Sequence, residues 1–441
     1  MLLEFKFQNF RSFRDETVLS LEATGLSAFK GSLIKYGTKN LLPGIAIFGK
    51  NGGGKSNVIR AFWLAVQFIK NAQRTQHENS EIPVNPFALN DYSRNEPTAF
   101  EFIYTLDDIL YIYGFSATKE KIVSEYLYHS PNGQKALVFS RDYQKFSFTN
   151  KSEKARRTLI SETVAENQLF FSVACTMNDS DCIRAMRWFR EYVYFSRDYT
   201  DISTQIFENI DDKNIINAIT SYAKNADIGI LDMSFEYKSK DVSFPEDLPE
   251  GIKSALMTLL ANLSAGANES EAKLKMGEIV ATSFHQGIRK DGKNETYLLD
   301  VSDESDGTRK LMALAPAIET VLQKGGILMV DEIERELHPL LVKYIISKFQ
   351  SKNTNKGGAQ IVFTTHNTEL MNLDIIRKDQ LYFVDKDSNE GTSELYSISD
   401  FSTKTSENIR KGYIVGKYGA TPDVEIEEVE WWEEKSNTSN L

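Results

Sequence analysis

The chain has 441 residues, of which 41% are hydrophobic and 26% are charged, and its formal net charge is −11. This length exceeds one compact domain and predicts a main body with a large insertion or a second lobe. No run approaches the roughly 18 apolar residues of a membrane-spanning helix, and no secretion signal opens the chain, so a membrane protein is not expected. The acidity argues against a protein that coats nucleic acid by bulk attraction, although a local basic groove stays open.

Two cysteines, Cys175 and Cys182, are present, and they lack the CxxC spacing of a zinc hook. We interpret both as packing residues of a protein in the reducing cytoplasm.

The first elements in chain order predict a sheet that leads into a glycine-rich loop. Apolar and polar residues alternate over residues 3–8, which is the period of a half-buried strand. Residues 44–48 form an apolar run typical of a buried strand. The glycine-rich residues 49–57 follow, and then a helical pattern over residues 58–69. This order is strand, phosphate loop, helix.

The next segments complete the first part of the fold. Two aromatic and β-branched runs within residues 98–116 flank Leu106–Asp108 and predict an antiparallel hairpin, with more short strands up to residue 148. We therefore assign residues 1–148 to the N-terminal part of an α/β head. Longer segments of mixed charge then predict a mainly helical insertion over residues 149–290.

Strands return in residues 291–400, which we assign to the C-terminal part of the head. After a strand near residues 295–301 and a helix, the buried strand of residues 325–331 is followed by a helix and by the strand of residues 360–366. A strand, helix and strand in close succession form a right-handed parallel crossover, the unit of an α/β sheet. Residues 401–441 are predicted to be a tail with a solvated and disordered acidic end.

The strongest chemical signal is the sequence GKNGGGKS at residues 49–56, which matches G-x-x-x-x-G-K-S between a strand and a helix. Glycines let the backbone wrap tightly so that several N–H groups face phosphate oxygens at the positive end of the helix. Lys55 is expected to contact the β- and γ-phosphates, and Ser56 to hold Mg²⁺. The predicted nucleotide-binding residues of this segment are Gly49, Asn51, Gly52, Gly53, Gly54, Lys55, Ser56 and Asn57.

Two carboxylates follow the strand of residues 327–330 at the edge where ligands bind in open α/β sheets. Asp331 can reach Mg²⁺, and Glu332 can polarise the water that attacks the γ-phosphate. His366 closes the next strand at the same edge and can sense the γ-phosphate. Without the phosphate loop, the two carboxylates would be interpreted as an ordinary strand end and His366 as a structural histidine. The presence of the phosphate loop favours catalytic roles for Glu332, Lys55 and His366.

Residues 304–309, ESDGTR, open an apolar-faced helix between these two halves. Ser305 and Gly307 there can form an anion site from a hydroxyl, free N–H groups and the helix dipole. An N-cap without a ligand is the alternative. The amino-acid composition of this segment does not distinguish an anion site from an N-cap without a ligand.

The ordered set GKNGGGKS, SDGT, ILMVDE, ERELHP and TTH resembles the ABC-type ATPase head, in the subgroup of chromosome-maintenance, Rad50 and RecF proteins. Within it, the set is most similar to bacterial AAA15 and OLD-like ATPases, many of them parts of anti-phage systems. The opening Asn9–Phe13 matches the subgroup, and the resemblance implies that Arg11 contacts nucleotide phosphates. It also implies that Ser305 and Gly307 bind the γ-phosphate held by a second copy, so that ATP joins two heads.

Departures from the pattern limit the resemblance. Asp306 and Thr308 replace the Gly and Gln of transporters, and residues 85–87 are a weak candidate for the loop that senses Mg²⁺. The insertion is too short for long coiled coils and lacks zinc-hook cysteines. Only about 75 residues follow His366, too few for an appended nuclease domain, so an effector would be a separate chain.

We therefore expect a Mg²⁺-dependent ATPase that forms a dimer, or a higher oligomer built from dimers, and acts as the sensor and scaffold of an anti-phage complex. Its partner would be a nuclease or toxin, and its trigger a phage product. The ATPase subunit of PARIS is the most similar type, with Septu and AbiL as alternatives; this step is analogy. A RecF-like DNA clamp and a non-hydrolysing ATP-bound scaffold are the rival functions, and a small-molecule kinase is a remote third.

Overall fold

The computed structural model describes residues 1–75, 80–131, 133–196, 202–227, 229–241, 251, 275–402 and 407–422. The acidic end of the predicted tail, residues 423–441, lies outside the described residues. Residues 253–264, which belong to the segment predicted as a mainly helical insertion, also lie outside the described residues.

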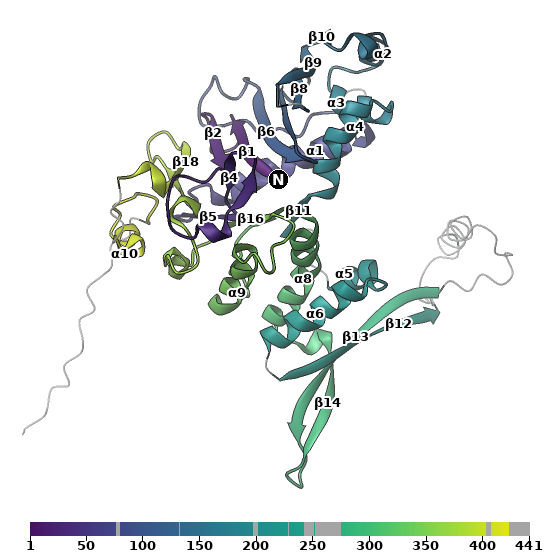
Figure 1. Ribbon diagram of the computed structural model, residues 1–441, viewed down its shortest axis with the longest axis vertical. Coiled ribbons are helices and arrows are strands. Elements are labelled where there is room, and N and C mark those ends of the chain that lie inside the picture. The colour runs from purple at the N-terminus through teal and green to yellow at the C-terminus, as the bar shows by residue number, and fades with distance from the viewer. Residues whose placement is uncertain are drawn as a thin grey trace, which may run out of the picture.

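A seven-stranded antiparallel sheet forms one lobe of the molecule (Figure 1). Its first strand is the predicted N-terminal one, and the predicted hairpin turns at Asp107 and Asp108, which both have left-handed backbone angles. In spatial order its strands are β10 (Lys145–Ser147), β9 (Ala136–Asp142), β8 (Ile122–Ser130), β7 (Ile109–Ala117), β6 (Thr98–Leu106), β1 (Leu2–Gln8) and β2 (Thr17–Ser20).

A second sheet has six strands, of which all but the last pair are parallel. In spatial order they are β11 (Val193–Phe195), β15 (Gly326–Val330), β16 (Ala359–Thr364), β5 (Gly44–Gly49), β17 (Leu381–Lys386) and β18 (Ser393–Ser397). Because β5, β15 and β16 run in the same direction, the segments that follow them meet at one edge of the sheet.

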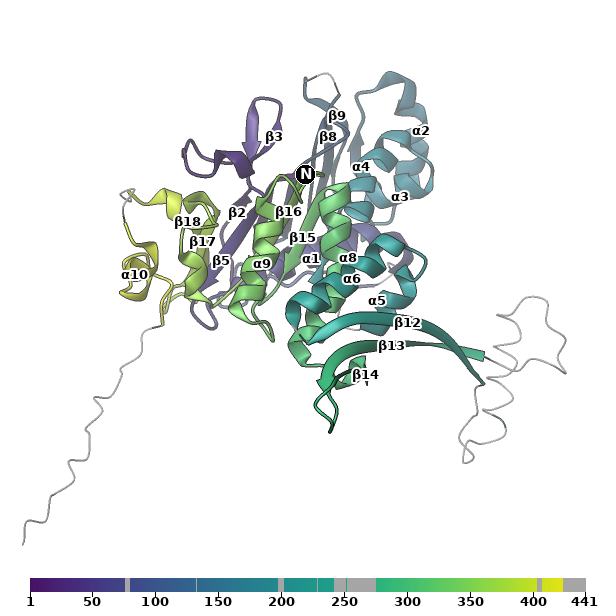
Figure 2. The same ribbon diagram turned by 60° about the horizontal axis from the view of Figure 1, so that its bottom comes forward.

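The two faces of this parallel sheet belong to two hydrophobic cores. Ile45 and Ile47 of β5 pack in one core with helix α1 (Lys55–Thr75) and the antiparallel sheet, whereas Ala46 and Phe48 belong to the other. The second core contains helices α8 (Asp306–Lys324) and α9 (Pro339–Gln350), which lie in front of the parallel strands in Figure 2. Such alternation is what a sheet covered on both faces requires. The predicted α/β head is therefore confirmed.

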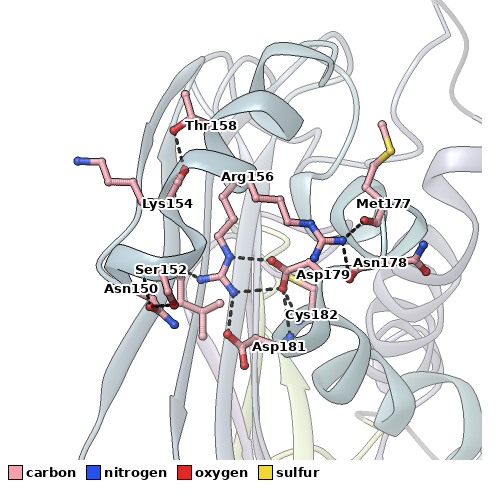
Figure 3. A network of polar contacts seen from close by, with 12 residues as sticks. Asn150, Ser152, Lys154, Arg156, Thr158, Met177, Asn178, Asp179, Asp181 and Cys182 are labelled. Atoms are coloured by element: carbon pink, nitrogen blue, oxygen red, sulfur yellow. Dashed lines mark hydrogen bonds and ion pairs between the residues drawn. The ribbon is translucent and has the colours of Figure 1, made fainter.

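Helices α2 (Lys151–Glu162), α3 (Phe170–Thr176) and α4 (Ser180–Glu191) begin the predicted insertion. Arg157 joins α2 to the start of α4: its guanidinium bonds Asp179 and Asp181, and its Nη1 donates to the Val138 carbonyl. Figure 3 shows Asp179 and Asp181 within this network of polar contacts. Directly after α4, strand β11 pairs with β15 of the parallel sheet. The part of the chain predicted as a separate insertion thus contributes a strand to the head itself.

The prediction of a mainly helical segment up to residue 290 is wrong beyond α5 (Ile202–Asn209) and α6 (Lys213–Ala226). There the chain forms a three-stranded antiparallel sheet of β12 (Ile230–Asp241), β13 (Lys275–Ile288) and β14 (Asn294–Asp300). This sheet extends away from the two large sheets (Figure 1). Alternation of polar and apolar residues over 232–237 is the strand period, which the mixed charge of the segment obscures.

Short elements complete the described part of the chain. They are β3 (Ile34–Tyr36), β4 (Lys39–Leu41), α10 (Ile409–Ile414), and the 3-10 helices η1 (Lys30–Ser32), η3 (Val301–Asp303), η4 (Thr368–Met371), η5 (Lys378–Gln380) and η6 (Ile398–Asp400). Among the helices of these described residues, none combines the length and apolarity needed to cross a membrane.

Candidate nucleotide site

The phosphate loop joins β5 to α1, and contacts within the chain define its shape. Gly54 has a left-handed φ of 118°, and a Cβ there would lie 2.7 Å from Ser393 Oγ and 2.9 Å from Ser12 Oγ. Only glycine fits this position without displacing its neighbours. The Lys55 ammonium is buried and donates to the carbonyls of Gly49 at 2.8 Å and Lys50 at 3.1 Å. Backbone carbonyls of the loop therefore hold the Lys55 ammonium in place.

Two serines anchor the loop to segments that are distant in sequence. Ser393 of β18 donates from its hydroxyl to the Gly53 carbonyl at 2.6 Å and from its backbone to the Ser12 carbonyl at 2.7 Å. Asn57 Nδ2 donates to Ser12 Oγ at 2.9 Å. The Asn57 side chain thus connects the first turn of α1 to the N-terminal segment, which is a structural contact in addition to the predicted nucleotide contact.

Arg11 lies in this N-terminal segment with a left-handed φ of 52°. Burial lowers the pKa of its guanidinium, and the neighbouring charge of Arg60 on α1 lowers it further. Both arginines are exposed, and no ion pair joins either of them to a carboxylate in the described part of the chain. Two adjacent cations without counter-ions favour an anion at this place. The sequence analysis did not single out Arg60, because no motif includes it. Its position one helical turn after Ser56 is the one sequence feature that could have indicated it.

The candidate loop at residues 85–87 also lies against the N-terminal segment. The backbone N–H of Arg11 donates to the Asn85 carbonyl at 2.7 Å, and that of Phe87 donates to Asn9 Oδ1 at 2.9 Å. Its role in sensing Mg²⁺ stays a prediction.

Asp331 and Glu332 follow β15 at the edge where β5 leads into the phosphate loop. The buried Thr364 hydroxyl, at the end of β16, donates to Asp331 Oδ1 at 2.7 Å and accepts from the Glu332 N–H at 2.7 Å. Glu332 has a left-handed φ of 51°, a conformation that side chains other than glycine rarely adopt and that clusters at functional sites. Thr364 therefore fixes both carboxylate residues, a role that the sequence did not indicate.

His366 lies just beyond β16, and its backbone N–H donates to Glu334 Oε1 at 2.5 Å. Burial lowers the pKa of the imidazole, the Lys55 charge lowers it further, and Glu334, Glu332 and Asp331 oppose these effects. The neutral form at pH 7 can accept a hydrogen bond at one nitrogen and donate from the other.

The same carboxylates act on Lys55. Burial lowers the pKa of its ammonium, while Glu332, Glu334 and Asp331 favour the charged form. The structure therefore brings the phosphate loop, Asp331, Glu332 and His366 into one electrostatic cluster, with Glu334 as an additional member.

Ser305 and Gly307 lie at the start of α8. Ser305 is the N-cap, because its hydroxyl accepts from the Thr308 N–H at 3.1 Å. A Cβ at Gly307 would lie 2.5 Å from the Glu336 carbonyl oxygen, so this loop packs against the turn that follows Glu332. In the described part of the chain, no hydrogen bond joins Ser305 to the phosphate loop of the same chain.

Comparison with known proteins bears on this geometry. The family described as "AAA domain, putative AbiEii toxin, Type IV TA system" (AAA_21) matches residues 45–372, from β5 to beyond His366. The match spans most of the chain. The chain is a P-loop ATPase of this family. Its ABC-type arrangement of phosphate loop, helix-capping SDGT segment and paired carboxylates agrees with the resemblance inferred from the sequence.

Individual relatives are distant. The Retron Vc95 probable ATPase of Vibrio cholerae serotype O1 biovar El Tor is 22% identical in an alignment 423 residues long, which covers 87% of this chain and 76% of the relative. Among solved structures, the Smc head bound to the C-winged helix domain of ScpA has a TM-score of 0.41 and 14% identity, covering 90% of this chain and 97% of that one. The recombination mediator RecF with ATP has a TM-score of 0.36 and 14% identity, covering 90% and 97%.

Proposed function

We propose that this ATPase hydrolyses ATP with Mg²⁺ at a site built from two copies of the chain. The observation that carries the proposal is the meeting of three segments at one sheet edge: the phosphate loop after β5, Asp331 and Glu332 after β15, and His366 after β16. Each supplies one requirement of phosphoryl transfer, namely phosphate binding, metal and water positioning, and contact with the γ-phosphate.

The donor set fits a Mg²⁺ ion. Ser56 offers a hydroxyl at the start of α1. Thr364 bonds Oδ1 of Asp331, and within the described residues no hydrogen bond occupies the other oxygen of this carboxylate. Hard oxygen ligands of this kind suit Mg²⁺. When bound, Mg²⁺ neutralises the negative charge that gathers on the β- and γ-phosphates. Glu332, held through its N–H by Thr364, then accepts a proton from the attacking water.

Ser305 and Gly307 supply the argument for the second copy. Ser305 bonds only within its own helix start in the described part of the chain, and α8 presents the positive end of its dipole there. A γ-phosphate bound by another copy would accept hydrogen bonds from this hydroxyl and from the free N–H groups. ATP would then be favoured by the joined state, and hydrolysis would loosen it.

We further propose that this nucleotide-dependent assembly is the sensor and scaffold of a bacterial defence complex that controls a separate toxin or nuclease. The family description names a toxin of a type IV toxin–antitoxin system, and the Vibrio cholerae relative belongs to a retron. Cytoplasmic location and a phage-derived trigger are parts of this proposal.

The mass and ATP turnover of the purified chain, with ATP and Mg²⁺, test these proposals. Glu332→Gln should lower turnover by about 100-fold or more, as removal of a principal catalytic group does, and should trap an ATP-bound dimer. Glu162→Gln, an exposed change on α2, is the control and should match wild type. A chain that stays monomeric with ATP would contradict the two-copy site, and ATP-dependent DNA binding by that monomer would favour a DNA clamp. Adding the products of neighbouring genes to the trapped dimer tests the effector.

A further inference from the structure

Glu334 joins two segments of the candidate site. It lies in the turn between Glu332 and α9, which is closed by bonds from the Arg335 N–H to the Glu332 carbonyl at 3.0 Å and from the Leu337 N–H to the Glu334 carbonyl at 2.9 Å. From this turn its Oε1 accepts the backbone N–H of His366 at 2.5 Å. One carboxylate therefore links the segment after β15 to the histidine loop after β16.

The other oxygen of this carboxylate, Oε2, is buried and has no hydrogen-bond partner within the described residues. Buried carboxylate oxygens normally accept a hydrogen bond, because burial without one is unfavourable. Glu334 acts electrostatically on both Lys55 and His366, so this oxygen is close to the groups that would surround a γ-phosphate. A hydrogen-bond donor that enters the site with a ligand would give this oxygen a partner.

Resting on the proposed ATP hydrolysis, we propose that Glu334 is a positioning residue: Oε1 holds the histidine loop through the His366 N–H, and Oε2 accepts a hydrogen bond from a water that enters with ATP. Glu332 remains the base.

Two substitutions distinguish the roles of the two carboxylate oxygens of Glu334. Glu334→Gln keeps the side-chain shape, and its amide oxygen must face the His366 N–H, because the amide nitrogen cannot accept a hydrogen bond. The second oxygen then becomes an NH₂ donor. Glu334→Ala removes both functions. Glu162→Ala on α2, which removes an exposed glutamate far from this edge in sequence, is the control.

Hydrogen exchange of the chain without nucleotide tests the first oxygen independently of ATP hydrolysis. We expect the amides of residues 365–368 to exchange at least about tenfold faster in Glu334→Ala than in wild type, since a lost closing bond exposes them. Glu334→Gln and Glu162→Ala should stay within about twofold of wild type. Unchanged exchange in Glu334→Ala would overturn the positioning role.

Steady-state kinetics test the second oxygen. Glu334→Gln should lower kcat for ATP by about tenfold while KM changes by less than about twofold, because the lost hydrogen bond orders a water and is not a contact with ATP itself. Wild-type kcat in Glu334→Gln would overturn the role of Oε2. If the wild-type chain itself does not hydrolyse ATP, the proposed function fails and so does the role of Oε2, whereas the exchange result still decides the role of Oε1.

Discussion

Arg157 and Lys55 are both buried cations beside several carboxylates, but their surroundings are built differently. Arg157 forms hydrogen-bonded ion pairs with Asp179 and Asp181 at 2.7 Å each and also bonds a backbone carbonyl. Lys55 bonds only backbone carbonyls of its own loop in the described part of the chain. Asp331, Glu332 and Glu334 act on it electrostatically without forming an ion pair with it there.

This contrast indicates which of the two clusters is suited to bind a ligand. The Arg157 cluster satisfies its own charges: burial would raise the pKa of Asp179, but the bonds from Arg157 and from the Cys182 N–H outweigh it and keep the pKa below its usual value. In the other cluster, as far as the structure describes the chain, Glu334 Oε2 is buried without a hydrogen-bond partner and one oxygen of Asp331 accepts no hydrogen bond. Groups with perturbed pKa values cluster at functional sites, and in this cluster the pKa values of Lys55 and His366 are both lowered.

The largest expected effect is on stability, from breaking the satisfied cluster. Arg157→Met should lower the free energy of unfolding by about 3–5 kcal/mol, because it leaves Asp179 and Asp181 buried without their cation. Denaturant unfolding monitored by circular dichroism measures this. Arg156→Met is the matched control: Arg156 is exposed and bonds only the Met177 and Asn178 carbonyls, so its loss should be below about 1 kcal/mol. If the two changes lowered the free energy of unfolding equally, the buried ion pairs of Arg157 would not be the source of the effect.

The next effect concerns ligand binding by the unsatisfied cluster. ATP with Mg²⁺ at about 100 times its Kd should stabilise the wild-type chain by about 2.7 kcal/mol. Lys55→Ala should lose this stabilisation, and chelation of Mg²⁺ should reduce it. Thermal unfolding with and without ATP is the measurement. Stabilisation of Lys55→Ala equal to that of wild type would place ATP elsewhere.

Sequence reasoning reached the parts of this site that are encoded locally. The phosphate loop has a fixed spacing, and Asp331 and Glu332 follow a recognisable buried strand, so both could be located without the structure. Thr364, Arg60 and Glu334 could not, because their roles depend on contacts with strands and loops distant in sequence. The fold shows the same limit, because β11 joins the parallel sheet by pairing with β15, which is distant in sequence. The first paired residues of the two strands, Val193 and Ile327, lie 134 positions apart.

A smaller effect is expected at the start of α8. Asp and Asn both cap helices as Ser does, so Ser305→Asp and Ser305→Asn should keep the stability of wild type within about 0.5 kcal/mol. Only the aspartate adds a negative charge where a second copy would place its γ-phosphate. Ser305→Asp should therefore weaken ATP-dependent dimers by at least about tenfold relative to Ser305→Asn, measured by sedimentation. Equal dimerisation of both variants would argue against phosphate at Ser305.

The smallest effect concerns the two thiols beside the Arg157 cluster. Burial raises the pKa of Cys175 to about 12 and that of Cys182 well above its ordinary value. Both should resist a thiol reagent at pH 8 in the native chain, because the thiolate is the reactive form. Arg157→Met should speed their labelling through local opening. Rapid labelling of native wild type would contradict the packed environment seen around α4.

Mixing two inactive variants tests the two-copy site most directly. Lys55→Ala disables the phosphate loop, and Ser305→Asp disables the start of α8, so neither variant alone should hydrolyse ATP. In a mixed dimer, the intact loop of one copy meets the intact Ser305 of its partner. Equal mixing with free exchange should restore about one quarter of wild-type turnover, since half of the dimers are mixed and each has one intact site. No recovery, despite mixed dimers shown by mass, would contradict a nucleotide site shared between two copies.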